Sequence, residues 1–127
     1  MTIDAGLLTH CVITNNTSKG AGGGLQMRNS SSYVRNCVVA FNKSTNTGSS
    51  YGVSNGKAGG GGVSMTGGTI ENCTFYGNVS SSQTRCDELS MDGGTVRNCI
   101  FVGKDATLAN DIRKSGGTAT YCFFRTE

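Results

Sequence analysis

The amino-acid sequence predicts an all-β fold, namely a parallel β-helix (solenoid) of about five coils that is either complete or a segment of a longer one. Three observations carry this prediction. A segment centred on a cysteine recurs five times, a second apolar segment precedes the last four of these, and Gly-Gly pairs stand between the two kinds of segment. Self-similarity at a period of about 20–50 residues is the signature of a repeat architecture.

The cysteine segments align without gaps and predict one strand region in every coil. Each has an apolar residue three positions before the cysteine and a bulky pair directly after it. Such alternation is typical of half-buried strands. The cysteines stand 26, 36, 26 and 23 residues apart, at Cys11, Cys37, Cys73, Cys99 and Cys122.

The upstream segments predict a second strand region in coils two to five. Equivalent residues of stacked coils lie about 4.7–4.9 Å apart, so they should form columns along the axis. The predicted core columns are Leu25/Val63/Leu89/Ile112, Met27/Met65/Met91 and Val34/Ile70/Val96/Ala119. The glycine pairs Gly67-Gly68, Gly93-Gly94 and Gly116-Gly117 should form corners, where positive φ angles or close backbone approach are needed.

We therefore expect a single domain over residues 1–127. Its coils cover approximately residues 1–18, 19–44, 45–80, 81–105 and 106–127, with a long loop at 43–59. The first coil has no Gly-Gly-Leu segment, and no polar cap is evident at either end. Open ends expose core side chains and strand edges, which predicts truncation, self-association, or both.

An asparagine precedes the cysteine in the three middle coils. We expect these residues to stack as an internal or corner ladder whose amides hydrogen-bond along the axis, with His10 and Tyr121 in the same position at the two ends. The asparagines are Asn36, Asn72 and Asn98. The residues before them should point to solvent and alternate in charge, as Arg35, Glu71 and Arg97.

The cysteines of the repeat are interpreted as small buried apolar residues. Thiols stacked at the coil spacing are too far apart for the mean disulfide Cβ separation of about 3.8 Å. A metal site is the alternative, but neither a CxxC motif nor a Cys-His pair at zinc-finger spacing is present. Cys86 stands outside the repeat and is expected to be exposed or reactive.

Composition excludes several classes of function. The net charge of +3 comes from scattered residues, so nucleic-acid binding has no support. No apolar run reaches the ~20 residues of a membrane span, and the N-terminus lacks the basic and apolar regions of a signal peptide. Either the protein stays in the cytosol, or it is a segment of a longer exported chain that begins at an introduced Met.

The repeated pattern Gly-Gly-Thr-Val/Ile-x-Asn-Cys-x-Phe, as in residues 67–75 and 93–101, resembles the short β-helix repeats of bacterial surface and secreted proteins with a pectate-lyase-like solenoid. A more distant resemblance is to chlamydial polymorphic outer-membrane proteins, whose Phe-x-x-Asn motif matches residues 75–78. The resemblance implies a right-handed solenoid, export, surface display and contact with glycans or neighbouring surfaces. It implies no specific chemistry.

Two interruptions of the repeat are candidate sites. The first is the long loop at 43–59, which is read first as a tolerated insertion. As a functional loop, it would offer an aromatic platform and polar groups to a sugar through Tyr51, Asn55 and Lys57.

The second interruption is an acidic corner. Asp87-Glu88 and Asn110-Asp111 stand where earlier coils have Gly-Gly. Glu88 and Asp111 would be neighbours, at a separation suited to a retaining glycosidase, and these carboxylates with Asp87 could instead bind Ca²⁺. In a polysaccharide lyase, Arg113 would serve as the base. The plain alternative is a salt-bridged corner neutralised by arginines.

The leading hypothesis is a non-catalytic repeat segment of a bacterial surface or secreted protein, which acts as a rigid spacer or as a carbohydrate- or protein-binding face. The alternative is a small carbohydrate-active enzyme, a glycoside hydrolase or polysaccharide lyase, that uses Glu88 and Asp111. We expect no cofactor other than an optional Ca²⁺. The expected partners are a polysaccharide or cell-surface glycan and further copies of the chain, bound through open coil ends.

Overall fold

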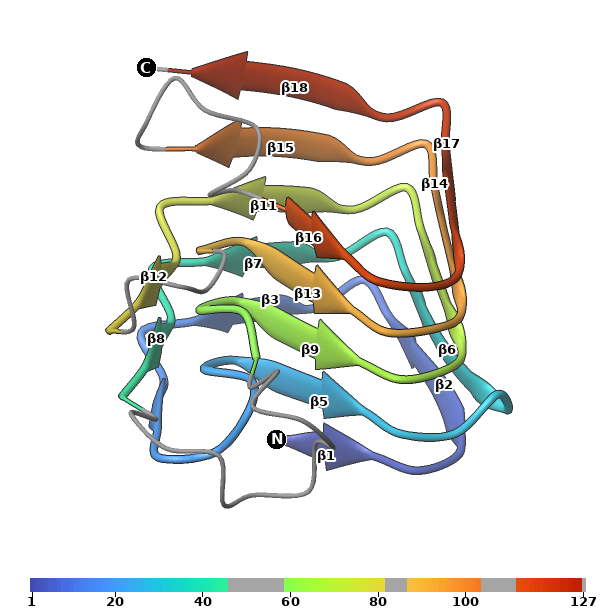
Figure 1. Ribbon diagram of the computed structural model, residues 1–127, viewed down its shortest axis with the longest axis horizontal. Helices are drawn as coiled ribbons and strands as arrows, with labels where there is room; N and C mark the ends of the chain where they lie inside the picture. Colours follow the sequence, from blue (N-terminus) through green and yellow to red (C-terminus); the bar gives the residue numbers. More distant parts are fainter. Residues whose placement is uncertain (46–58, 82–86, 104–111, 127) are drawn as a thin grey trace.

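The computed structural model describes residues 1–45, 59–81, 87–103 and 112–126. It confirms the predicted fold class, a right-handed parallel β-helix of about five coils (Figure 1). Each strand pairs in parallel with its equivalents in the adjacent coils, so the sheets run along the axis and the termini lie at opposite ends of the stack. No helix in the described parts of the chain is long and apolar enough to span a membrane.

Four sheets, named A to D in the order in which the chain visits them, make up the walls. Sheet A contains β1 (Thr2–Ile3), β5 (Leu25–Met27), β9 (Val63–Met65), β13 (Leu89–Met91) and β16 (Ile112–Lys114). Sheet B contains β2 (Gly6–Thr9), β6 (Ser32–Arg35), β10 (Thr69–Glu71), β14 (Thr95–Arg97) and β17 (Thr118–Thr120). Sheet C contains β3 (Val12–Thr14), β7 (Val38–Ala40), β11 (Thr74–Tyr76), β15 (Ile100–Gly103) and β18 (Phe123–Thr126). The short sheet D contains β4 (Thr17–Ser18), β8 (Lys43–Ser44) and β12 (Val79–Ser80).

The register confirms the predicted core columns. Leu25 pairs with Val63, Val63 with Leu89, and Leu89 with Ile112, and the methionine and valine columns keep the same alignment. The first coil also contributes to sheet A, although its sequence lacks the glycine-leucine segment. Its two-residue strand β1 sets Ile3 opposite Met27.

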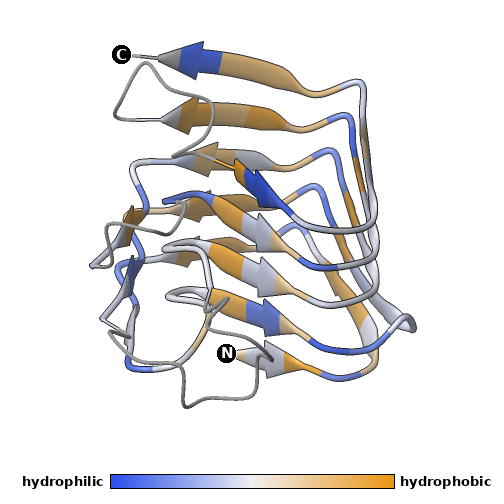
Figure 2. Cartoon of the chain, in the orientation of Figure 1, coloured by the Kyte–Doolittle hydropathy of each residue, from blue (hydrophilic) through white to orange (hydrophobic). Residues whose placement is uncertain are grey.

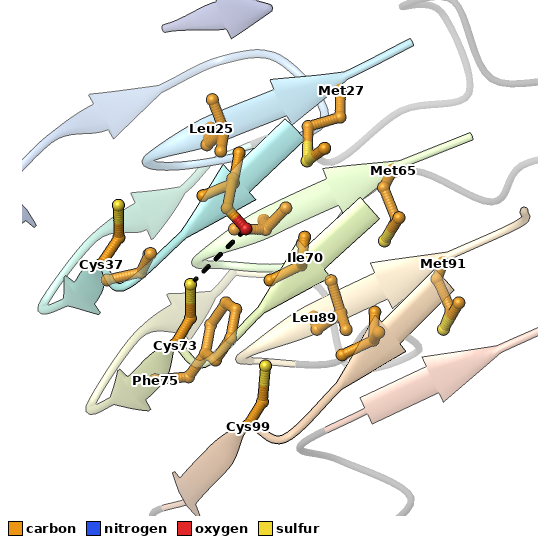
Figure 3. Packing of buried hydrophobic residues seen from close by; sticks show 14 of the residues in the cluster. Leu25, Met27, Cys37, Met65, Ile70, Cys73, Phe75, Leu89, Met91 and Cys99 are labelled. Atoms are coloured by element: carbon orange, nitrogen blue, oxygen red, sulfur yellow. Dashed lines mark hydrogen bonds between the residues drawn. The ribbon is translucent and has the colours of Figure 1, made fainter. Parts of the chain in front are cut away.

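Apolar residues recur along the stacked strands (Figure 2), and their side chains pack in columns in the interior (Figure 3). Inward residues of sheets A, B and C in the middle coils are completely buried. In sheet C the rings of Phe75 and Phe101 stack at 4.5 Å with planes 12° apart, and Phe124 continues the stack at 5.3 Å. Aromatic rings in this offset range add attraction beyond their buried area.

Two kinds of left-handed backbone form the corners. Gly68, Gly94 and Gly117, between sheets A and B, have φ of 88°, 90° and 76°, as predicted for the glycine pairs. The asparagines before the cysteines turn the chain from sheet B to sheet C, with φ of 52–53°. Asparagine tolerates this conformation better than other non-glycine residues. At the two ends His10 and Tyr121 adopt it as well, with φ of 54° and 53°.

The prediction for this asparagine ladder was therefore right about the corner and wrong about hydrogen bonds between the asparagine amides, although Asn36 and His10 form one such bond along the axis. Asn36, Asn72 and Asn98 are exposed. Within the part of the chain that the structure describes, no hydrogen bond joins their side chains, and the amide of Asn36 lies 3.4 Å from Nε2 of His10. Their common feature is the backbone angle. A hydrogen-bonded column of asparagines exists elsewhere in the coil.

Candidate functional site

An asparagine column lies at the turn between sheets C and D and consists of exposed Asn16 and buried Asn42 and Asn78. Oδ1 of Asn42 accepts from the backbone N–H and the Nδ2 of Asn16 at 3.1 and 3.0 Å. Oδ1 of Asn78 accepts from the same two groups of Asn42, both at 2.9 Å. The Nδ2 groups of Asn42 and Asn78 also donate to the carbonyls of Ile13 and Val39. The column thus satisfies buried backbone groups where the chain leaves sheet C.

Glu88, the centre of the enzyme hypothesis, ends this column. Its side chain is completely buried just before β13. Oε1 accepts the backbone N–H of Asn78 at 3.2 Å, and Oε2 accepts the Nδ2 of Asn78. These are the two donors that the next asparagine amide in the series would bind. The carboxylate therefore occupies the place of a fourth amide oxygen.

Glycine stands at the matching position of the preceding coils for a steric reason. A Cβ on Gly24 would lie 2.8 Å from Cγ of Asn42, and a Cβ on Gly62 would lie 2.9 Å from Cγ of Asn78. An asparagine in the column thus excludes any side chain at this corner of its own coil. In the fourth coil the corner carries a side chain, and Glu88 reaches the donors of Asn78 directly.

The other predicted site residues divide into two groups. Asp87 is half-buried, and its Oδ1 accepts the backbone N–H of Ser80 at 2.7 Å. Arg113 is half-buried in β16, where it pairs with Ser90. The remaining candidates lie outside the described residues: Tyr51, Asn55, Lys57, Cys86 and Asp111. Among the residues that the structure describes, no group of three or more His, Cys, Asp or Glu side chains is arranged to hold a metal ion.

The outer face of sheet B carries the predicted charge ladder. Arg97 and Glu71 form an ion pair at 3.0 Å, and the hydroxyl of Tyr33 donates to the same carboxylate oxygen at 3.1 Å. Hydrogen bonding from Arg97 holds the pKa of Glu71 below its usual value. Beside this group lies a hollow of about 390 Å³, lined by Gly6, Leu7, Ser31, Tyr33 and Arg35.

The five repeat cysteines are free thiols, and the three in the middle coils are buried. Each Sγ–H donates to the carbonyl two residues earlier, at 3.1–3.3 Å. Burial raises the pKa of Cys37, and a hydrogen bond with Cys73 together with burial raises the pKa of Cys99. The interpretation of these residues as buried architecture is confirmed for the middle coils.

Sequence reasoning missed this asparagine column, although a signal was present. Asn16, Asn42 and Asn78 each follow the repeat cysteine by five residues. No protein-family model, curated protein or solved structure matches this chain. The protein is a parallel β-solenoid. Its likeness to pectate-lyase-like and chlamydial repeats thus remains a prediction from the sequence pattern.

Proposed function

We propose that the chain is a non-catalytic β-helix repeat segment that acts as a rigid spacer in a bacterial surface or secreted protein. The observation that carries the proposal is the burial of Glu88, whose two carboxylate oxygens accept hydrogen bonds from Asn78. A carboxylate that supplies structural hydrogen bonds from a closed interior is unsuited to contact a polysaccharide. Cell-surface display follows from the resemblance of the repeat pattern.

The enzyme alternative is tested with a panel of neutral and acidic polysaccharides. The wild-type chain and Glu88→Gln are incubated with each polymer, with and without Ca²⁺, and reducing ends and unsaturated products are measured. We expect no turnover by either protein. The proposal would be refuted if the wild type shows turnover and Glu88→Gln does not. For this comparison, the two proteins must have the same circular dichroism spectrum and the same unfolding midpoint.

Rigidity has its own test in native-state hydrogen exchange. A spacer requires that the coils open together, so the amides of β7, β11 and β15 should exchange at similar slow rates. Independent opening of one middle coil, seen as much faster exchange in one of these strands, contradicts a spacer role.

A binding face is a second candidate function, favoured by the hollow on sheet B. Tyr33 contributes an aromatic side chain to its lining, and Arg35 contributes a cationic group. Stacking on an aromatic ring with a polar neighbour is a common mode of sugar binding. A glycan array should then give a signal that Tyr33→Ala abolishes and that Thr118→Ala, on the same face, leaves intact. Equal signals from the two variants would exclude this hollow.

Self-association is also proposed, because the last coil exposes large apolar side chains. Phe123 is 60% and Phe124 38% exposed. Sedimentation velocity should show a mass that increases with concentration, and a constant monomer mass would refute self-association.

A further inference from the structure

The outer face of sheet C carries a continuous apolar stripe. In each strand of this sheet the first residue points outward and the second points into the core. The strands pair in register, so the outward residues of successive coils lie about 4.7–4.9 Å apart and touch their neighbours. From the first coil to the last, the stripe consists of Val12, Val38, Thr74, Ile100 and Phe123.

The stripe is exposed and lies on a face almost without charge. Its four apolar side chains are 39–69% exposed. The strands of sheet C contain one charged residue, Arg125, which lies in the last coil, whereas sheet B carries the charge ladder on its outer face. A contiguous exposed apolar patch marks an interaction site, and depletion of charge is typical of interface cores. The outer face of sheet C therefore has the character of an interface.

The sizes of the side chains identify the partner. The two largest, Phe123 and Ile100, lie toward one end of the stripe, and the two valines lie toward the other. Two such faces packed in the same direction would press phenylalanine against phenylalanine at one end and leave the valines apart at the other. Packed in opposite directions, each phenylalanine faces a valine and each isoleucine faces the other valine. The stripe is thus complementary in shape to a reversed copy of itself.

We propose that the outer face of sheet C binds the same face of a second copy of this chain in an antiparallel two-fold dimer. The two-fold axis runs along β11, in the plane between the two sheets, so Thr74 and Tyr76 of each copy face their own equivalents. Such an interface is isologous and closes at two copies. It is therefore distinct from association through the coil ends, which can continue to longer assemblies.

An aromatic pair at the centre of the face supports this arrangement. Tyr76 lies two residues after Thr74 in β11, and the ring of Phe41 from the preceding coil packs edge-on against it, with centroids 5.0 Å apart. Phe41 is exposed and has a φ of 54°, which is uncommon for a bulky residue. Its ring lies over Gly77, where an added Cβ would be 3.0 Å from it. Phe41 thus holds Tyr76 in place at the axis, which lowers the entropy cost of binding.

The size of the face sets the expected affinity. Five coils give about 24 Å along the axis, and three residues of each strand give about 10 Å across it. This is smaller than the standard interface of about 800 Å² per partner, so the dissociation constant should be roughly 10–1,000 µM.

The test places opposite charges at two positions of the stripe. V38K and I100E each put one charge into the face, and V38K/I100E carries both. In the reversed dimer the two introduced charges of different copies face each other, whereas in a same-direction dimer each charge faces its own kind. Thr95→Lys, on the outer face of sheet B in the same coil as Ile100, is the control. Sedimentation equilibrium of the reduced, full-length chain, at concentrations above and below the expected dissociation constant, measures dimerisation, and circular dichroism checks the fold.

V38K and I100E should each weaken dimerisation at least ~10-fold, and V38K/I100E should restore it to within ~3-fold of the wild type, because unpaired charges in an interface are costly and opposite charges are not. Thr95→Lys should leave it unchanged. A wild type that stays monomeric, or a double variant as weak as the single ones, would overturn the proposal. Association that V38K leaves intact belongs to the coil ends and overturns it too, as does a monomer that pellets with phosphatidylcholine vesicles.

An NMR measurement on the wild type keeps the proposal testable if the charged variants do not fold. Labelled and unlabelled chains are mixed, and isotope-filtered spectra report only contacts between copies. Contacts between the methyl groups of Val38 and Ile100 are expected. Contacts of Val38 with Val38, or no contact between copies, would overturn the antiparallel dimer.

Discussion

Replacing Asn78 by alanine tests whether the asparagine column holds the coils together. The side chain takes part in four hydrogen bonds: two from Asn42, one to the carbonyl of Val39 and one to Glu88. The Asn78→Ala variant loses all four and adds no atom that could replace them. The effect should therefore spread to coils two, three and four.

The magnitude follows from the groups left without partners. Nδ2 of Asn42 still has the carbonyl of Ile13, but the N–H of Asn42 loses the amide oxygen of Asn78. A carboxylate oxygen of buried Glu88 loses a donor as well. An unsatisfied buried group costs about 1–3 kcal/mol, and a hydrogen bond to a charged group contributes about 1.5–3 kcal/mol, so the loss should total ~3–6 kcal/mol. This is a large part of the ~5–15 kcal/mol by which a domain is usually stable.

Urea unfolding followed by circular dichroism measures the loss. Asn72→Ala is the matched control, because Asn72 is the same residue type in the same coil but is exposed at a corner with φ of 52°. Alanine there should cost only ~1 kcal/mol for the left-handed backbone, and glycine almost nothing. If Asn78→Ala costs no more than Asn72→Ala, the column does not carry the stability assigned to it.

Three further outcomes follow from packing and titration. A Cβ on Gly94 would lie 2.5 Å from a backbone oxygen, whereas a Cβ on Gly6 would meet nothing within 4 Å. Gly94→Ala should therefore lower the thermal midpoint far more than Gly6→Ala. Similar midpoints for the two variants would refute the argument that close packing requires glycine at this corner. Burial raises the pKa of Cys37, so the folded protein holds this proton more tightly than the unfolded chain. This contribution to the free energy of unfolding should be fully present below the unfolded pKa of about 8.5 and lost as pH rises toward the folded pKa, with a smaller decrease in a Cys37→Ala variant. The lowered pKa of Glu71 should return toward its ordinary value in Arg97→Ala, which NMR titration can measure. The stability that this ion pair contributes is present above the ordinary pKa of the carboxyl group and is lost as pH falls through its folded-state pKa.

The fold was predictable because every coil repeats the same local pattern. Alternation around the cysteine gives the strand and its inward face, and stacking follows from the repeat alone. The same logic fixes the glycine corners. It could not separate the two asparagine sets, because a left-handed corner and a buried amide both favour asparagine. Only the structure distinguishes exposed Asn72 from buried Asn78.

The role of the acidic corner was less predictable. Carboxylates are rarely buried without partners, so Glu88 was expected in a site or in a salt-bridged corner. Its partner, Asn78, is ten residues earlier in the sequence and belongs to the preceding coil. The pairing depends on the vertical offset between coils, a quantity that composition and spacing do not contain. A second strand in coil one was missed for a similar reason, since β1 has only two residues.

The fourth coil shows how the hydrogen-bonded column accommodates a break in the repeat. Five residues after Cys99 the sequence has Lys104 where the earlier coils have asparagine, and lysine has donors but no acceptor. With glycine at position 88, the buried N–H and amide of Asn78 would lose the two oxygens that they bind. Glutamate supplies both oxygens from the opposite end of the same coil. The replacement of glycine by an acid, which by sequence alone resembles a catalytic insertion, is therefore a requirement of the hydrogen-bonded column.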